Sequence, residues 1–132
     1  MKKLIIDRQT WLRGDKTSCL LNNNKHRCCL GFLAQQCGIK DKYIQNIGSL
    51  CEVIEEEKIN IFNIIDLQFL IDMSGKGTYN STDAYHLMEI NDIPINVEME
   101  LQPGIVIRSE LEREEFLKRK FAEYNIDVEF IN

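Results

Sequence analysis

The chain has 132 residues, of which 44% are hydrophobic and 28% charged, and its formal net charge is −5. This length suits a single domain spanning residues 1–132, and the composition excludes a fully disordered chain. No apolar run approaches the roughly 18 to 20 residues of a membrane span, and Leu4–Ile6 is too short for a signal peptide. We therefore expect a protein of the cytosol, or one made in a host cytosol.

The charge is distributed unevenly along the chain. Residues 1–40 hold eight basic and two acidic residues, a net +6, whereas residues 41–97 hold three and ten, a net −7. Residues 98–132 hold five basic and nine acidic residues, a net −4. A basic first third beside an acidic remainder can attract phosphates or an acidic partner, but the two parts can equally pair with each other inside the fold.

The cysteines are expected to be reduced thiols, because disulfides are rare in a reducing cytosol. No CxxC pair occurs, and the two histidines, His26 and His86, are 60 positions apart, so the paired spacing of a structural zinc site is missing. No motif predicts a metal or another cofactor. The five cysteines are Cys19, Cys28, Cys29, Cys37 and Cys51.

The first predicted elements are a short helix and a hairpin. Asp7 is a suitable N-cap for a helix over residues 8–13, and Gly14 could end it. The tetrapeptide NNNK at 22–25 separates two short runs that contain apolar residues. Because Asn tolerates positive φ, this pattern predicts a β-hairpin.

The next segment, CLGFLAQQC at 29–37, has the spacing of a helix, and Gly38 is an expected end for it. Gly31 lies within this helix, where glycine costs about 1 kcal/mol relative to alanine. A residue without a side chain at this position predicts that another backbone or a ligand passes close by. The apolar positions at helical spacing are Cys29, Leu30, Leu33, Ala34 and Cys37.

The middle of the chain is harder to interpret. Residues 51–73, with a strongly apolar half at 59–71, suit either a strand pair or a helix followed by a strand. SGKGTYN at 74–80 is a loop without the spacing of a phosphate-binding loop. A helix over 82–91 can be capped by Ser81 or Thr82, and Pro94 lies shortly after it. Along one side it would carry Ala84, Leu87, Met88 and Asn91.

The last third predicts strands around one well-marked helix. Residues 95–101 alternate as in a strand, and residues 103–109 allow a turn and a second short strand. Ser109–Glu112 is a capping box for a helix that should reach about Tyr124. Residues 126–131 read as a closing strand with alternate residues inward. The whole pattern predicts an α+β fold, with three or four helices packed on a small, mainly antiparallel sheet.

Five short sequence elements, spread over nearly the whole chain, resemble a group of small, largely uncharacterised bacteriophage and prophage proteins. These proteins carry WxRG, CCLGF, IND and IDVEF elements in this order. Residues 93–109 look longer than the usual connection and fall outside the resemblance. The matching elements are Asp7-Arg8, Trp11–Gly14, Cys28–Phe32, Ile90–Asp92 and Ile126–Phe130.

The resemblance implies a phage or prophage accessory protein that acts by stoichiometric binding in the host cytoplasm, as a counter-defence inhibitor of a host factor. It transfers no catalytic residue. The expected partner is a host protein or a nucleotide-like anion, with no membrane involved. Direct nucleic-acid binding is less favoured, and a homodimer is compatible with the sequence.

The alternative function is a small cysteine-dependent enzyme. Cys28 or Cys29 lies at a predicted helix N-terminus after three basic residues, 25–27, and both the helix dipole and these cations favour a thiolate. His26 or His86 could act as the base. Against this, free cysteines are among the residues most often buried in cores, and we assign no catalytic residue.

The same segment can also be interpreted as a binding site. A helix N-terminus flanked by cations, with Gly31 permitting close approach, is a ready anion site. Trp11 and Arg13 could add a stacking surface and a guanidinium. The competing interpretation is that Trp11 fills the core and the cations lie on its rim. The predicted binding residues are Trp11, Arg13, Lys25, His26, Arg27, Cys28 and Gly31.

A third possibility is an acidic surface that imitates a nucleic-acid backbone to a nucleic-acid-binding enzyme. Its candidate residues are Glu55–Glu57 and the acidic side of the last helix, although such charge runs are more often only solvated faces. The acidic residues of that helix are Glu110, Glu112, Glu114 and Glu115.

Overall fold

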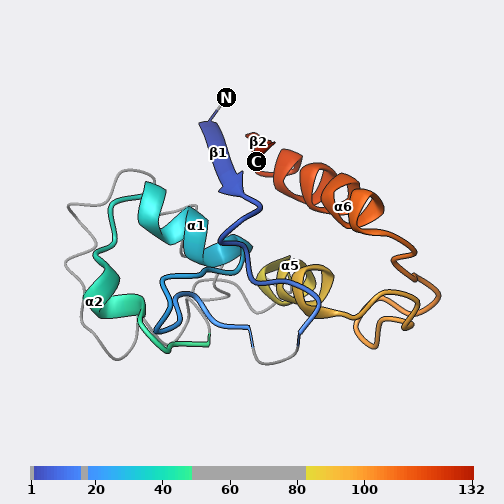
Figure 1. The fold of residues 1–132 in the computed structure, drawn as a ribbon. Helices are drawn as coiled ribbons and strands as arrows, with labels where there is room; N and C mark the ends of the chain where they lie inside the picture. Colours follow the sequence, from blue (N-terminus) through green and yellow to red (C-terminus); the bar gives the residue numbers. More distant parts are fainter. Residues whose placement is uncertain (1, 16–17, 49–82) are drawn as a thin grey trace.

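The computed structural model describes residues 2–15, 18–48 and 83–132 (Figure 1). The predictions for residues 49–82, including the acidic run Glu55–Glu57 and the cap at Ser81 or Thr82, lie outside this range. The elements in chain order are β1 (Lys2–Asp7), α1 (Cys29–Gln36), α2 (Asp41–Ile44), α5 (Asp83–Asp92), α6 (Glu110–Ala122) and β2 (Ile126–Ile131).

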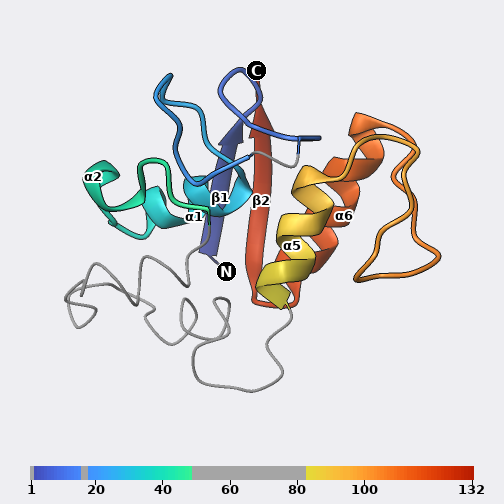
Figure 2. The ribbon, with the colours of Figure 1, turned by 90° about the horizontal axis from the view of Figure 1, so that it is seen from below.

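The two ends of the chain form the sheet, and its strands are parallel. Leu4 pairs with Val128, and the register runs from Lys2 opposite Ile126 to Asp7 opposite Ile131. Figure 2 shows β1 and β2 side by side and pointing the same way, so the N- and C-termini lie at opposite ends of the sheet. The predicted antiparallel sheet is therefore wrong.

The physical reason is that the expected local hairpins do not form ladders. The two predicted strands at 95–101 and 103–109 form a single antiparallel bridge, between Glu98 and Val106, with two backbone hydrogen bonds beside it and no longer ladder. A parallel pair needs a long crossover between its strands. Here the chain between β1 and β2 is that crossover, and local sequence patterns do not reveal it.

One face of the sheet is buried against helices. Leu4 and Ile6 of β1, with Ile126 and Val128 of β2, are at most 5% exposed, whereas Ile5 on the opposite face is 39% exposed. Helix α1 packs on β1, α6 packs on β2, and α5 contacts both helices (Figure 1). The inward alternation predicted for residues 126–131 is confirmed for Ile126 and Val128, and Phe130 is partly buried.

Helix α1 is buried along most of its length, and Gly31 shows why the chain has glycine there. A Cβ at Gly31 would lie 1.9 Å from the carbonyl oxygen of Leu20 and 3.0 Å from Cβ of Arg27. The prediction that another backbone crosses at Gly31 is confirmed, and the crossing group is the Leu20 carbonyl. The predicted end of the helix also agrees, since Gly38 has φ +94°.

The predicted helix over residues 8–13 is wrong. Asp7 accepts a hydrogen bond from the Gln9 amide, which caps a turn, and Trp11 then forms a parallel bridge with Arg27. The Arg27 amide donates to the Thr10 carbonyl at 2.9 Å, and the Leu12 amide donates to the Arg27 carbonyl at 2.7 Å. These bonds to a distant segment satisfy the backbone that a helix would have satisfied locally.

The predicted hairpin at 22–25 is half right. The Asn22 amide donates to the His26 carbonyl across a tight turn, but the residue with positive φ is Lys25. The flanking runs share one further hydrogen bond, from the Cys28 amide to the Cys19 carbonyl at 3.0 Å. They form no ladder among the described residues, and the bridges of Leu21 and Arg27 go instead to Gln45 and Trp11.

The predicted capping of the last helix is confirmed. Ser109 Oγ accepts a hydrogen bond from the Glu112 amide at 3.1 Å, and α6 ends at Ala122, two residues before the predicted Tyr124. Two acidic residues in the first turn and two basic residues in the last turn also suit the helix dipole.

Among the described residues, no helix is long and apolar enough to cross a membrane.

Candidate functional site

The two adjacent cysteines at the start of α1 lie in the core. Cys28 is 6% exposed and Cys29 is fully buried. Burial raises the pKa of Cys28 to about 12 and raises that of Cys29 well above its usual value. The helix dipole and nearby cations were expected to favour a thiolate. Desolvation outweighs them here because the thiols are removed from water.

A single buried side chain, Asn91 near the end of α5, joins three segments of the chain. Its Oδ1 accepts hydrogen bonds from the indole of Trp11 at 2.8 Å and from the Cys29 amide at 3.0 Å. Its Nδ2 donates to the Leu12 carbonyl at 2.9 Å. The backbone carbonyl of Asn91 accepts a hydrogen bond from the Gly14 amide at 2.8 Å. The first amide of α1 is therefore bonded to protein.

The sequence prediction did not name Asn91 as a functional residue. The signal was visible, because Asn91 is a polar residue on the otherwise apolar side predicted for residues 82–91. Buried polar side chains are nearly always hydrogen-bonded, so such a position predicts a polar contact inside the protein.

A buried arginine binds the backbone carbonyls at the end of α5. Arg113 is fully buried, and its Nη1 donates to the carbonyls of Ile90 at 2.7 Å and Asn91 at 3.1 Å. Its Nε donates to Glu110 at 2.9 Å. An arginine that bonds the last carbonyls of a helix also complements the negative end of the helix dipole.

The acidic residues of α6 also face inward in part. Glu114 is 8% exposed in its side chain and accepts two hydrogen bonds from Arg8, at 2.8 and 2.9 Å. Glu110 binds both Arg113 and Arg13. Two of the four acidic residues of this side, Glu110 and Glu114, therefore pair with the basic first third, which is the internal pairing that the charge distribution allowed.

Trp11 and Arg13, which were predicted as a stacking surface and a guanidinium for an anion, contact each other. The Arg13 guanidinium lies 4.5 Å from the Trp11 ring centroid, and it also binds the backbone carbonyls of Arg8 and Trp11. Trp11 is 5% exposed and its other neighbour is Phe130, at 5.1 Å between ring centroids. Trp11 therefore belongs to the core and Arg13 covers it.

A hollow of about 290 Å³ lies beside Trp11 and Arg13. It is lined by Trp11, Leu12, Arg13, Asp15, Ser18, Cys19 and Asn22.

The remaining predicted binding residues do not gather around one ligand position. Arg27 is buried and pairs with Asp41 at 3.0 Å, Lys25 is exposed in the turn, and His26 is partly buried. Gly31 faces the Leu20 carbonyl and not a cavity. The structure brings Trp11 and Arg13 together, but it does not join the full predicted set into one anion site.

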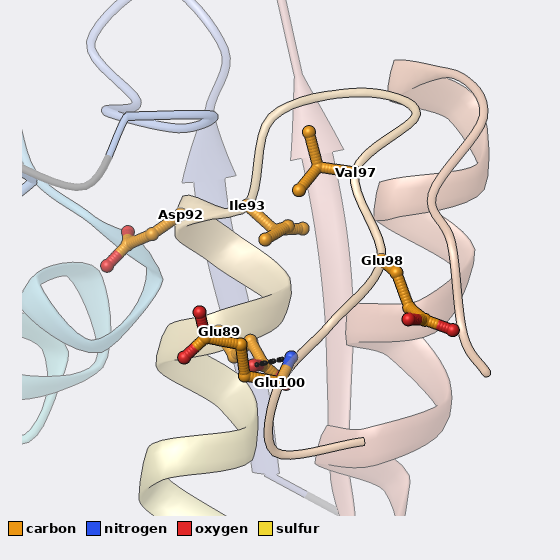
Figure 3. Close-up of a pocket in the computed structure, with 6 residues that line it drawn as sticks. All are labelled: Glu89, Asp92, Ile93, Val97, Glu98 and Glu100. Carbon is orange, nitrogen blue, oxygen red and sulfur yellow. Dashed lines mark hydrogen bonds between the residues drawn. The ribbon is translucent and has the colours of Figure 1, made fainter. Parts of the chain in front are cut away.

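A second pocket, of about 300 Å³, lies where the end of α5 meets the loop at 94–107 (Figure 3). Its apolar side chains, Ile93 and Val97, face each other, while the carboxylates of Asp92 and Glu98 point to opposite sides. Its lining residues are Glu89, Asp92, Ile93, Val97, Glu98 and Glu100. Sequence reasoning did not select this pocket, although residues 83–107 contain five acidic residues and no Lys or Arg.

Asp92 lies between this pocket and the core. Burial raises its pKa to about 6, although the hydrogen bond from Asn91 Nδ2, at 2.7 Å, acts in the opposite direction. The positive charge of Arg113 lowers the pKa and the negative charge of Asp15 raises it. Within the described residues, no group of three or more His, Cys, Asp or Glu side chains could hold a metal ion.

No protein-family model, curated protein or solved structure shows a significant match to this chain. Any function must therefore be argued from the residues and their geometry.

Proposed function

We propose that this chain is a phage or prophage accessory protein that acts by stoichiometric binding in the host cytoplasm, as a counter-defence inhibitor of a host protein. The observation that carries the proposal is that the reactive and cationic groups singled out in the sequence are largely engaged within the fold. Cys28 and Cys29 are buried, and Arg8, Arg13 and Arg27 each bind a carboxylate.

The cysteine-dependent enzyme is less well supported by this geometry. A cysteine nucleophile needs an accessible thiolate, usually with a depressed pKa. Both cysteines have raised pKa values and little exposure. Stoichiometric binding requires neither an accessible thiolate nor a depressed pKa.

A protein partner is also better supported than a nucleotide-like anion. The first amide of α1 already donates to Asn91, and the Arg13 guanidinium already binds Glu110 and two carbonyls. In contrast, Glu89 and Glu100 at the acidic pocket have no ion-pair partner among the described residues. The unneutralised charge is negative, which disfavours an anionic ligand.

The elements that carry the phage resemblance contact one another. Trp11 of WxRG and the Cys29 amide of CCLGF bind Asn91 of IND, and Phe130 of IDVEF packs on Trp11. These contacts support the idea that the elements shared with the phage proteins form one connected part of the fold. They also indicate that these elements hold the fold together, so the partner is recognised by other residues.

The experiment is a capture from host lysate with tagged protein, run in parallel with extraction of small molecules from the purified protein. The proposal predicts a saturable host protein at a fixed ratio to the bait and no co-purified nucleotide. The inhibitory effect in cells should rise with the amount of protein and saturate at that ratio. Turnover of a thiol ester, amide or nucleotide that Cys28→Ala or Cys29→Ala abolishes would contradict the proposal.

A further inference from the structure

We propose that the loop at 94–107 and the last turns of α5 form the docking surface, and that this surface takes a basic segment of the partner that also carries apolar side chains. We call it the loop surface, and this inference rests on the proposed stoichiometric binding. Its residues are Glu89, Asp92, Ile93, Val97, Glu98, Glu100 and Leu101.

The loop surface exposes large apolar side chains that the fold leaves uncovered. Val97 is 41% exposed and Leu101 is 54% exposed, while Met99 between them is 2% exposed and anchors the loop in the core. Val97 also faces Ile93 in the pocket (Figure 3). A partner that covered Val97 and Leu101 would gain the free energy of removing this apolar surface from water.

The charge around these side chains is negative and unneutralised. The salt bridges of the described residues neutralise Glu110, Glu114 and Glu129, but none involves Glu89, Glu98 or Glu100. Complementary charge steers a partner and selects against wrong ones. A segment with Lys or Arg therefore fits this surface, and an acidic segment does not.

The loop is held in a fixed shape before any partner binds. Glu89 accepts hydrogen bonds from the amides of Glu100 and Leu101, at 2.9 and 2.8 Å, and from the side chain of Gln102. Glu98 accepts from the Gly104 amide at 3.2 Å. The Met99 amide donates to the Ile105 carbonyl at 3.0 Å. A preorganised loop avoids much of the entropy loss that ordering a flexible segment would cost on binding.

The shape of the pocket narrows the chemistry of the partner further. Apolar walls from Ile93 and Val97 suit the methylene stem of a lysine or arginine, and the surrounding carboxylates suit its charged end. Leu101 lies outside the pocket lining and is available to an apolar neighbour on the same segment.

The test compares a charge reversal on the loop surface with a matched reversal elsewhere. Glu98→Lys with Glu100→Lys changes the loop surface. Glu115→Lys with Glu123→Lys makes the same change in net charge on α6 and its C-cap, where these two glutamates pair with Lys118 and Lys120. The probe is a fluorescent peptide of alternating lysine and leucine, with a glutamate and leucine peptide as its opposite. Denaturant midpoints confirm that each variant is folded.

We expect the lysine peptide to bind the wild type and the α6 variant about equally, and the loop variant at least about tenfold more weakly. Leu101→Asn should also weaken binding, whereas Leu111→Asn, at a leucine that is 69% exposed on α6, should not. An equal loss of affinity for the lysine peptide in both charge variants would mean non-specific attraction and would overturn the proposal. The proposal would also be overturned if the wild type bound the glutamate peptide more tightly than the lysine peptide.

The same variants used as bait in host lysate separate this inference from the proposed function. If the wild type captures a host protein at a fixed ratio and the loop variant captures it equally well, stoichiometric binding stands and the loop surface is wrong. If the wild type captures no protein and instead shows turnover, the proposed function itself fails. Loss of capture in the loop variant alone supports both.

Discussion

Replacing Gly31 with alanine should destabilise the protein, although the same change usually stabilises a helix. The new Cβ would lie 1.9 Å from the oxygen and 2.7 Å from the carbon of the Leu20 carbonyl. These are backbone atoms, so relief requires moving α1 or the chain around Leu20. Overpacking of this kind costs about 3 kcal/mol, and the better helix propensity of alanine returns about 1 kcal/mol. We expect a net loss of about 2 kcal/mol.

Gly38→Ala is the matched control for this prediction. Its site has no atom within 4 Å of the new Cβ but has φ +94°, so its cost comes from the backbone conformation, at about 1 to 2 kcal/mol. Urea unfolding of both variants at equal m-value measures the two costs. Wild-type stability or better for Gly31→Ala would refute the close contact with Leu20.

Three further predictions concern the buried polar groups and the thiols. Asn91→Ala should lower the free energy of unfolding by at least about 3 kcal/mol, because it leaves three buried backbone and indole groups without a partner, and thermal or urea unfolding measures this. Asp92 has its folded-state pKa raised from 3.8 to about 6, so the folded state binds its proton more tightly and stability falls as pH rises through that window. The Asp92→Asn variant should match the wild type near about pH 4 and exceed it by up to about 3 kcal/mol near about pH 7, and a difference that does not change with pH would contradict this assignment. Alkylation without denaturant, followed by peptide mass spectrometry, should label the partly exposed Cys19 before Cys28 and Cys29, and a reversed order would count against their burial.

If the loop surface is the docking site, the ionisation of Asp92, which is one of its residues, should affect binding as well as stability. Asp92 lines the pocket, so its ionisation adds negative charge to the loop surface as pH rises through about 6. Binding of the lysine peptide should therefore strengthen across the same window in which the folded state loses stability. The Asp92→Asn variant tests both effects, because without this ionisation neither the stability nor the peptide affinity should change through the titration of residue 92.

The sequence by itself determined the features that depend on neighbouring residues. The Ser109 cap, the alternation of residues 126–131 and the end of α1 at Gly38 each follow from local hydrogen bonding or backbone conformation, and all agree with the structure. The crossing at Gly31 was also predictable, because glycine inside a buried helix needs a reason and close packing is the usual one. The contact of Arg13 with Trp11 did not follow from the sequence, because residues two apart share a face only in an extended segment and residues 8–13 were predicted to be a helix.

Only the tertiary structure decided which distant segments meet. Residues 8–13 have a good cap and a suitable end for a helix, yet they form a turn and a bridge because Arg27 supplies their backbone partners. The sheet is parallel because β1 finds β2 at the other end of the chain, a pairing that no local pattern encodes. The pKa values of Cys28 and Cys29 are raised for the same reason: the pKa of a thiol depends on what buries it, and here that is the packing of segments far apart in sequence.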